Sequence, residues 1–177
     1  MVNLPKLTKE DNARVKLEAT RFQDDSEARG VRDSLYGKTR DGHIATTIKG
    51  FNGEVLFSRW SGIPWEPEPG AFKAGPADFP PDIEVRTVYP KQGGGAPSHP
   101  YLKVTPRDVQ VNPRRRFYAI SHENGQPFQL VGWCFADETD GMGTINPNGW
   151  GAMFAVHPKD LHRISCKRGV QPIEEAT

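Results

Sequence analysis

The sequence has few of the features that mark disulfide-bonded, membrane-spanning or strongly charged proteins. It has 2 cysteines among 177 residues, Cys134 and Cys166. Their separation fits neither a zinc knuckle nor a disulfide framework, so we expect both to act as small hydrophobic residues. No apolar run approaches the roughly 18 residues of a membrane span, and the N-terminal residues lack the apolar core of a signal peptide. We therefore expect a soluble, cytoplasmic protein without a membrane partner.

The charges of the chain nearly cancel. There are 23 Lys and Arg against 22 Asp and Glu, a formal net charge of +1. The protein as a whole therefore lacks the field that draws nucleic acids to strongly basic proteins, and any nucleic-acid surface must be local. Of the residues, 36% are hydrophobic, which is enough for one core and predicts a single domain.

The first predicted helix spans residues 7–30. Its apolar residues form a weak amphipathic pattern, Thr8 followed by Asp11 is a plausible cap, and Gly30 is a stop. A charged connector with turn-forming residues follows at 31–42.

The second helix is predicted over residues 43–60, where apolar residues recur at helical spacing before Gly62. Gly50 and Gly53 lie within one turn of it. They indicate that another backbone or a ligand approaches closely, or that the helix is shorter and follows a loop. Residues 64–81 contain six prolines and are predicted to be a loop.

The second half of the chain is rich in strands. Residues 83–89 alternate, with apolar side chains on one face and Glu84 and Arg86 on the other. Further strands are predicted at 101–105, 117–122, 128–135 and 152–156, loops at 106–116 and 140–151, and a turn with a short helix at 157–164. An Asn-Gly pair joins the two longest of these strands, which is typical of a hairpin. The sequence predicts an α+β fold, with a mixed or largely antiparallel central sheet flanked by helices.

Charged residues gather around the start of the strand at 83–89. Glu84 and Arg86 share a face, Asp82 precedes them on that face, and Asp78 lies in the loop before the strand. Buried charges are costly unless they are paired or hold a metal ion. Carboxylate oxygens are the ligands that Mg²⁺ prefers, and a neighbouring cation stabilises charge that develops on a phosphate. A solvent-facing ion pair between Glu84 and Arg86 is the simpler alternative.

Several short motifs follow one another in a recognisable order. They comprise Gly50, Gly53 and Glu54 on the second helix, Phe72, Lys73 and Asp78 in the loop, Glu84, Val85, Arg86 and Thr87 on the strand, and then Leu102, Val104, Val131, Gly132, Trp133, Phe154, Pro158 and Leu161. In this order the motifs resemble the PD-(D/E)xK nuclease superfamily and, more closely, a phage-encoded branch of it. The resemblance covers residues 50–161.

The resemblance implies a restriction-endonuclease-like core that hydrolyses DNA phosphodiester bonds with Mg²⁺ or Mn²⁺. Asp78 and Glu84 would bind the ion together with the backbone carbonyl of Val85. Glu54 would reach the ion directly or through water. Arg86 would stand in the place of the family's lysine.

If the resemblance holds, the chain divides into three parts. Residues 1–42 form an N-terminal helix and charged connector, 43–165 form the nuclease-like core, and 166–177 form a C-terminal tail. A phage-encoded protein of this kind would act in the cytoplasm of the host.

Two choices of site residue remain open. Lysine can lose its proton and help to activate water, whereas arginine stays protonated. Arg86 therefore implies either water activated by the metal with electrostatic help, or a site that binds DNA without cutting it; Lys103 is the alternative lysine. Asp78 lies six residues before Glu84 and fits the family's loop placement better, whereas Asp82 keeps strand phase with Glu84.

Other polar residues have simpler interpretations beside the functional ones. Lys73, Arg114, Arg115 and Arg116 are candidates for contacts with DNA phosphates, although three adjacent arginines also fit a charged loop tip. The spacing of His157 and His162 does not favour a zinc site.

Two further functions are compatible with this sequence. The first is a catalytically silent protein of the nuclease fold that binds DNA or acts as a phage accessory protein. The second is a virion-associated or interaction protein whose charged residues are only surface. Metal-dependent hydrolysis that depends on Glu84 and Asp78 separates the nuclease from both.

Overall fold

The structure is a computed structural model that describes residues 1–30, 39–67, 77–88, 102–122, 126–139, 144–145 and 153–164. Its helices are α1 (Lys9–Ala28), α2 (Arg40–Ser61) and α3 (Pro106–Val111), and its strands are β1 (Val2–Asn3), β2 (Ile83–Val88), β3 (Leu102–Val104), β4 (Arg116–Ser121), β5 (Gln129–Phe135), β6 (Thr144–Ile145) and β7 (Met153–Val156). Short 3-10 turns occur at Asp137–Thr139 and Pro158–Asp160. The predicted α+β class is confirmed. None of the described helices is long and apolar enough to cross a membrane.

Helix α1 begins with the predicted cap. Thr8 Oγ1 accepts a hydrogen bond from the Asp11 amide (3.1 Å), and the Asp11 carboxylate accepts one from the Thr8 amide (2.7 Å). This reciprocal arrangement satisfies two amides near the start of the helix. Val15 and Ala19 on α1 are fully buried. The N-terminal helix therefore contributes to the main core.

Helix α2 packs closely against strand β2. It ends at Gly62, whose φ of 80° favours glycine. A Cβ atom on Gly53 would lie 2.0 Å from Thr87 Oγ1, and that hydroxyl donates a hydrogen bond to the Gly50 carbonyl (3.3 Å). The predicted close approach is therefore confirmed at Gly53, where the Thr87 side chain makes it, whereas no atom lies within 4 Å of a Cβ placed on Gly50. This contact places Glu54, the next residue of α2, beside β2.

The main sheet has the strand order β1-β5-β4-β2. Strands β2 and β4 are parallel, whereas β4 and β1 each pair with β5 in the antiparallel sense. The sheet is therefore mixed and largely antiparallel, as predicted. Strands β4 and β5 are those expected to form the hairpin, and the Asn-Gly pair between them lies outside the described residues.

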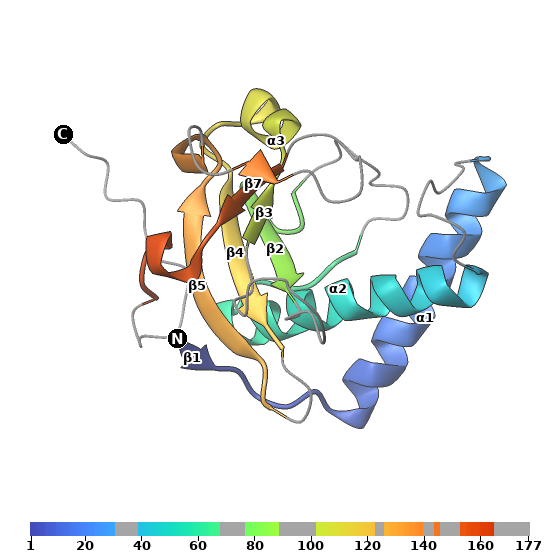
Figure 1. Cartoon of the computed structure of the whole chain (residues 1–177). Coiled ribbons are helices and arrows are strands. Elements are labelled where there is room, and N and C mark those ends of the chain that lie inside the picture. Colours follow the sequence, from blue (N-terminus) through green and yellow to red (C-terminus); the bar gives the residue numbers. More distant parts are fainter. Residues whose placement is uncertain are drawn as a thin grey trace, which may run out of the picture.

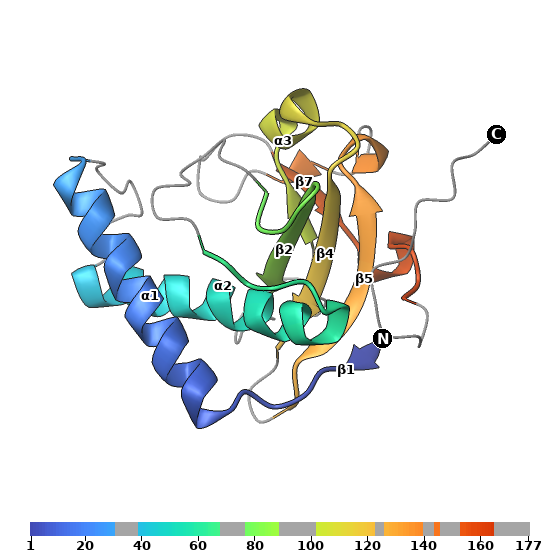
Figure 2. The same ribbon diagram turned by 180° about the vertical axis from the view of Figure 1, so that it is seen from behind.

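Two layers cover the faces of the main sheet. Figures 1 and 2 show α2, crossed by α1, on one face, and strands β3 and β7 of a smaller β3-β7-β6 sheet on the other. Ile83 and Val85 of β2 belong to the core shared with the helices, whereas Phe117 of β4 belongs to the core beneath the smaller sheet. Because side chains alternate along a strand, Glu84 and Arg86 lie on the side of the smaller sheet.

The prediction of a loop over residues 106–116 was wrong for its first half. Helix α3 occupies Pro106–Val111, and Thr105 and Asp108 form a reciprocal cap like that of α1. The sequence contained this signal, since Thr-x-x-Asp with proline at the first helical position is typical of a helix start.

Two very short strands were not predicted. Residues 144–145, within the predicted loop 140–151, form β6 by pairing with β7, and β1 forms by pairing with β5. Each is defined by a partner distant in the sequence, and two residues are too few to show a periodic pattern.

Candidate active site

The loop before β2 brings an acidic side chain to the edge of that strand. Phe79 and Ile83 exchange backbone hydrogen bonds of 3.0 and 2.9 Å around a tight turn. The turn sets Asp78 alongside β2, where its Oδ2 accepts a hydrogen bond from the Val85 amide (2.8 Å). Among the described residues β2 has a strand partner on one side only. The carboxylate therefore supplies the acceptor that a neighbouring strand would otherwise provide.

A second carboxyl group comes from α2. Glu54 is partly buried, and its Oε2 accepts a hydrogen bond from Trp65 Nε1 (2.8 Å). The charge of Glu84 acts on Glu54, and the charge of Glu54 acts on Asp78. Acidic residues from α2, from the loop and from β2 are therefore near enough for their charges to influence one another.

Glu84 lies between two guanidinium groups. Its Oε1 is 3.0 Å from Arg115 Nη1, and its Oε2 is 3.5 Å from Arg86 Nη2. Glu84 is 7% exposed, so these two contacts compensate for a charge that water hardly reaches. The Arg86 guanidinium also lies over the ring of Phe117, 5.6 Å from its centre. We refer to Glu54, Asp78, Glu84, Arg86 and Arg115 as the carboxylate–arginine cluster.

Burial raises the pKa of all three carboxyl groups. The pKa of Glu54 is raised to about 7 by burial, and the charge of Glu84 adds to this effect. The pKa of Asp78 is raised to about 6 by burial and by the charge of Glu54. The pKa of Glu84 is raised to about 7 by burial and by the charge of Asp78, although the two arginines oppose this shift. The cluster thus binds protons at pH values where isolated carboxyl groups have lost them.

Arg86 keeps its positive charge beside these carboxyl groups. Burial opposes the charge of Arg86, but the surrounding carboxylates, led by Glu84, outweigh it and raise its pKa. Arg86 therefore remains a cation.

The donor atoms of the cluster fit a hard divalent cation by their chemistry. Mg²⁺ and Mn²⁺ prefer carboxylate oxygens, and carboxyl groups that repel one another are stabilised when a cation replaces their protons. In the arrangement described here, however, no three His, Cys, Asp or Glu side chains of the described ranges lie close enough to hold an ion. Both oxygens of Glu84 face guanidinium groups. An ion bound by Glu54, Asp78 and Glu84 therefore requires these side chains to rearrange.

In the described part of the chain, neither of the two alternative site residues, Asp82 and Lys103, forms a hydrogen bond or ion pair with the three carboxyl groups of the cluster. The backbone carbonyl of Asp82 accepts a hydrogen bond from the Arg116 amide (2.9 Å), at the start of the pairing between β2 and β4. Lys103 is exposed on β3, between two buried neighbours.

The three adjacent arginines occupy different environments. Arg115 and Arg116 are buried, and Arg115 belongs to the cluster. Its Nε atom is buried without a hydrogen-bond partner within the described part of the chain. Arg114 is the exposed one, at 63% of its side chain, and it pairs with Asp137 (3.5 Å) and stacks on Phe135 (3.9 Å to the ring centre). A charged loop tip therefore describes Arg114 alone.

Other predicted positions lie outside the described residues or in the hydrophobic core. Lys73, Phe72 and Cys166 lie outside the described residues. Cys134 is buried in the core beneath the smaller sheet, and burial raises the pKa of its thiol to about 12. It behaves as the small hydrophobic residue that was predicted.

His157 and His162, the two histidines five residues apart, have different partners. His157 Nδ1 accepts a hydrogen bond from the Lys159 amide (3.1 Å). His162 Nε2 contacts the Glu138 carboxylate at 2.8 Å, and its ring stacks on Trp133 with 4.4 Å between centres.

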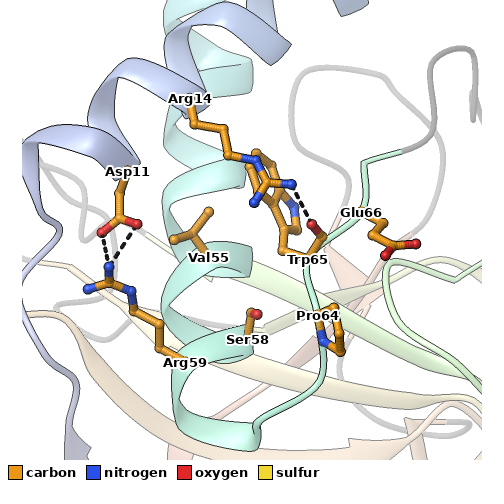
Figure 3. Close-up of a pocket in the computed structure, with 8 residues that line it drawn as sticks. All are labelled: Asp11, Arg14, Val55, Ser58, Arg59, Pro64, Trp65 and Glu66. Carbon is orange, nitrogen blue, oxygen red and sulfur yellow. Dashed lines mark hydrogen bonds and ion pairs between the residues drawn. The ribbon is translucent and has the colours of Figure 1, made fainter.

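A cleft of about 320 Å³ between α1 and α2 is connected to the cluster through Trp65, which lines the cleft and contacts Glu54. Figure 3 shows Arg14 of α1 over the ring of Trp65, and Arg59 of α2 paired with Asp11. No local sequence pattern indicates these contacts of Trp65, because its partners lie 11 and 51 residues earlier in the chain.

Comparison with known proteins identifies no relative: no family model matches the chain, and no curated protein or solved structure shows significant similarity to it.

Proposed function

We propose that this protein is a nuclease that hydrolyses DNA phosphodiester bonds with Mg²⁺ or Mn²⁺. One observation carries the proposal. Glu54, Asp78 and Glu84 come from three separate segments and interact with one another beside the guanidinium of Arg86. The resemblance to PD-(D/E)xK nucleases implies these same residues, on the same elements and in the same order.

Each residue of the cluster has a distinct task in this proposal. Glu54, Asp78 and Glu84 would hold the ion after their side chains rearrange, and the ion would act as a Lewis acid and lower the pKa of water. Arg86 cannot accept a proton from water, because arginine stays protonated. It instead stabilises negative charge that develops on the phosphate. Its contacts with Glu84 and with the Phe117 ring hold it in place for this role.

Cleavage assays on plasmid and end-labelled oligonucleotide DNA test the proposal. We expect cleavage with added Mg²⁺ or Mn²⁺ and none with EDTA. Glu84→Ala and Asp78→Asn should each lower the rate about 100-fold or more. Asp82→Asn is the matched control, because it changes an acid of the same loop whose carboxylate forms no hydrogen bond or ion pair with the cluster in the described part of the chain. Full activity in Asp78→Asn, or an equal loss in Asp82→Asn, would contradict the assignment.

A second function, DNA binding without cleavage, is favoured by the contacts of Glu84. Arg115 and Arg86 already neutralise this carboxyl group, at 3.0 and 3.5 Å. The protein itself therefore supplies the positive charge that a metal ion would otherwise bring to Glu84. A protein of this kind would bind DNA with an affinity that falls as the salt concentration rises. It would not cut DNA, whichever metal ion is added. An interaction or virion-associated protein would neither bind nor cut DNA.

A further inference from the structure

A chain of contacts connects helix α1 to the carboxyl group of Glu54. Arg14 Nη2 donates a hydrogen bond to the backbone carbonyl of Trp65 (2.8 Å), and the Arg14 guanidinium carbon lies 4.9 Å from the centre of the Trp65 ring. Figure 3 shows the Arg14 guanidinium beside the Trp65 ring, with a dashed line to the backbone carbonyl of Trp65. Trp65 Nε1 in turn donates a hydrogen bond to Glu54 Oε2 (2.8 Å). One arginine thus holds the residue that binds the carboxyl group.

Side-chain contacts, and not a backbone ladder, hold Trp65 in place. It lies in the segment 62–67, which follows α2 and has no regular secondary structure. Even so it is only 4% exposed. Its ring packs edge-to-face on Phe51 of α2, with 5.3 Å between centres. Arg14 and Phe51 therefore define where its N–H group points.

The direction of the Glu54 carboxyl group depends on that N–H group. A glutamate side chain has several rotatable bonds, and the charge of Glu84 repels this one. The hydrogen bond from Trp65 offsets the repulsion and keeps the carboxyl group at the cluster. Groups that hold metal ligands in this way commonly determine how well the ion binds.

We propose that Trp65 and Arg14 are positioning residues that orient Glu54, so that helix α1 is part of the functional site. The inference rests on the proposed function, in which Glu54 is a metal ligand. It extends the site beyond the core at 43–165 into the N-terminal helix.

Trp65→Phe tests the role of the N–H group, because it keeps a buried aromatic ring. We expect the Mn²⁺ concentration for half-maximal cleavage to rise about 10- to 100-fold, with the KM for DNA unchanged. Arg14→Met keeps the apolar length of the side chain and should shift the Mn²⁺ requirement in the same direction by a smaller factor. Trp60→Phe is the matched control, since Trp60 is buried in the same core and does not contact Glu54. An unchanged Mn²⁺ requirement in Trp65→Phe, or an equal shift in Trp60→Phe, overturns the inference.

Indole N–H signals in ¹H–¹⁵N NMR spectra test the same contact without any cleavage. The Trp65 signal, identified by its loss in Trp65→Phe, should exchange slowly with solvent. Glu54→Ala and Arg14→Met should speed that exchange about tenfold, while the Trp60 signal stays unchanged. Unchanged exchange at Trp65 in both variants overturns the inference. If the wild-type protein neither binds Mn²⁺ nor cuts DNA while Trp65 exchanges as expected, the proposed function fails and the orientation of Glu54 by Trp65 is supported.

Discussion

Replacing Glu54 by glutamine is expected to stabilise the metal-free protein at pH 8 and to change its stability little at pH 5. Burial raises the pKa of Glu54 from 4.5 to about 7, against the hydrogen bond from Trp65. The folded protein therefore holds this proton more tightly than the unfolded chain. The stability that this proton on Glu54 contributes is fully present below pH 4.5 and is lost as the pH rises to about 7. Glutamine still accepts the hydrogen bond from Trp65 and carries no charge at any pH.

The size of the effect follows from the two pKa values of Glu54. The difference between 4.5 and about 7, at about 1.4 kcal/mol per pKa unit, corresponds to about 3 kcal/mol at pH 8. Because Glu84 and Asp78 take part in the same titration, the gain from Glu54→Gln should lie between about 1 and 3 kcal/mol. At pH 5 Glu54 is already protonated in the folded protein, so the gain should be below about 1 kcal/mol.

Urea denaturation at pH 5 and pH 8 in EDTA measures this difference. Glu66→Gln is the control, because Glu66 is exposed in the same loop as Trp65 and should change stability by no more than about 0.5 kcal/mol. A loss of stability in Glu54→Gln that is the same at both pH values would refute the argument that the carboxylate is destabilised by burial.

Two further predictions concern the packing of α2 and the pairing of the buried arginine. Gly53→Ala should destabilise the protein by about 1 to 3 kcal/mol in urea denaturation, because the new Cβ meets Thr87. Gly50→Ala, where no atom lies within 4 Å of the new Cβ, should instead stabilise the protein by as much as about 1 kcal/mol through helix propensity. A similar loss of stability in both variants would contradict this packing. Arg115→Met should cost about 3 to 5 kcal/mol at pH 8, because it removes the closer of the two cations that pair with the buried carboxylate of Glu84. The exposed neighbour provides the comparison, since Arg114→Met should cost at most about 1 kcal/mol; equal losses would show that Arg115 is not a buried partner.

The sequence by itself determined the features that depend on near neighbours. The cap of α1 joins Thr8 to Asp11 through atoms three residues apart, and the alternation of β2 sets Glu84 and Arg86 on one face. Gly53 also indicated a close approach, although not what approaches. These interactions lie within one turn of helix or two steps of strand, so residue type and spacing are enough to predict them.

The choice of partners for the buried charges was decided only by the tertiary structure. Asp78 reaches the edge of β2 because a tight turn folds the loop back, whereas Asp82 stays outside the cluster. Arg115 meets Glu84 because β4 lies beside β2, while the adjacent Arg114 is exposed. A buried charge is stabilised by whatever opposite charge or polar group the fold brings within reach. The sequence therefore shows that these acids need partners, and the packing of distant segments determines which partners they have.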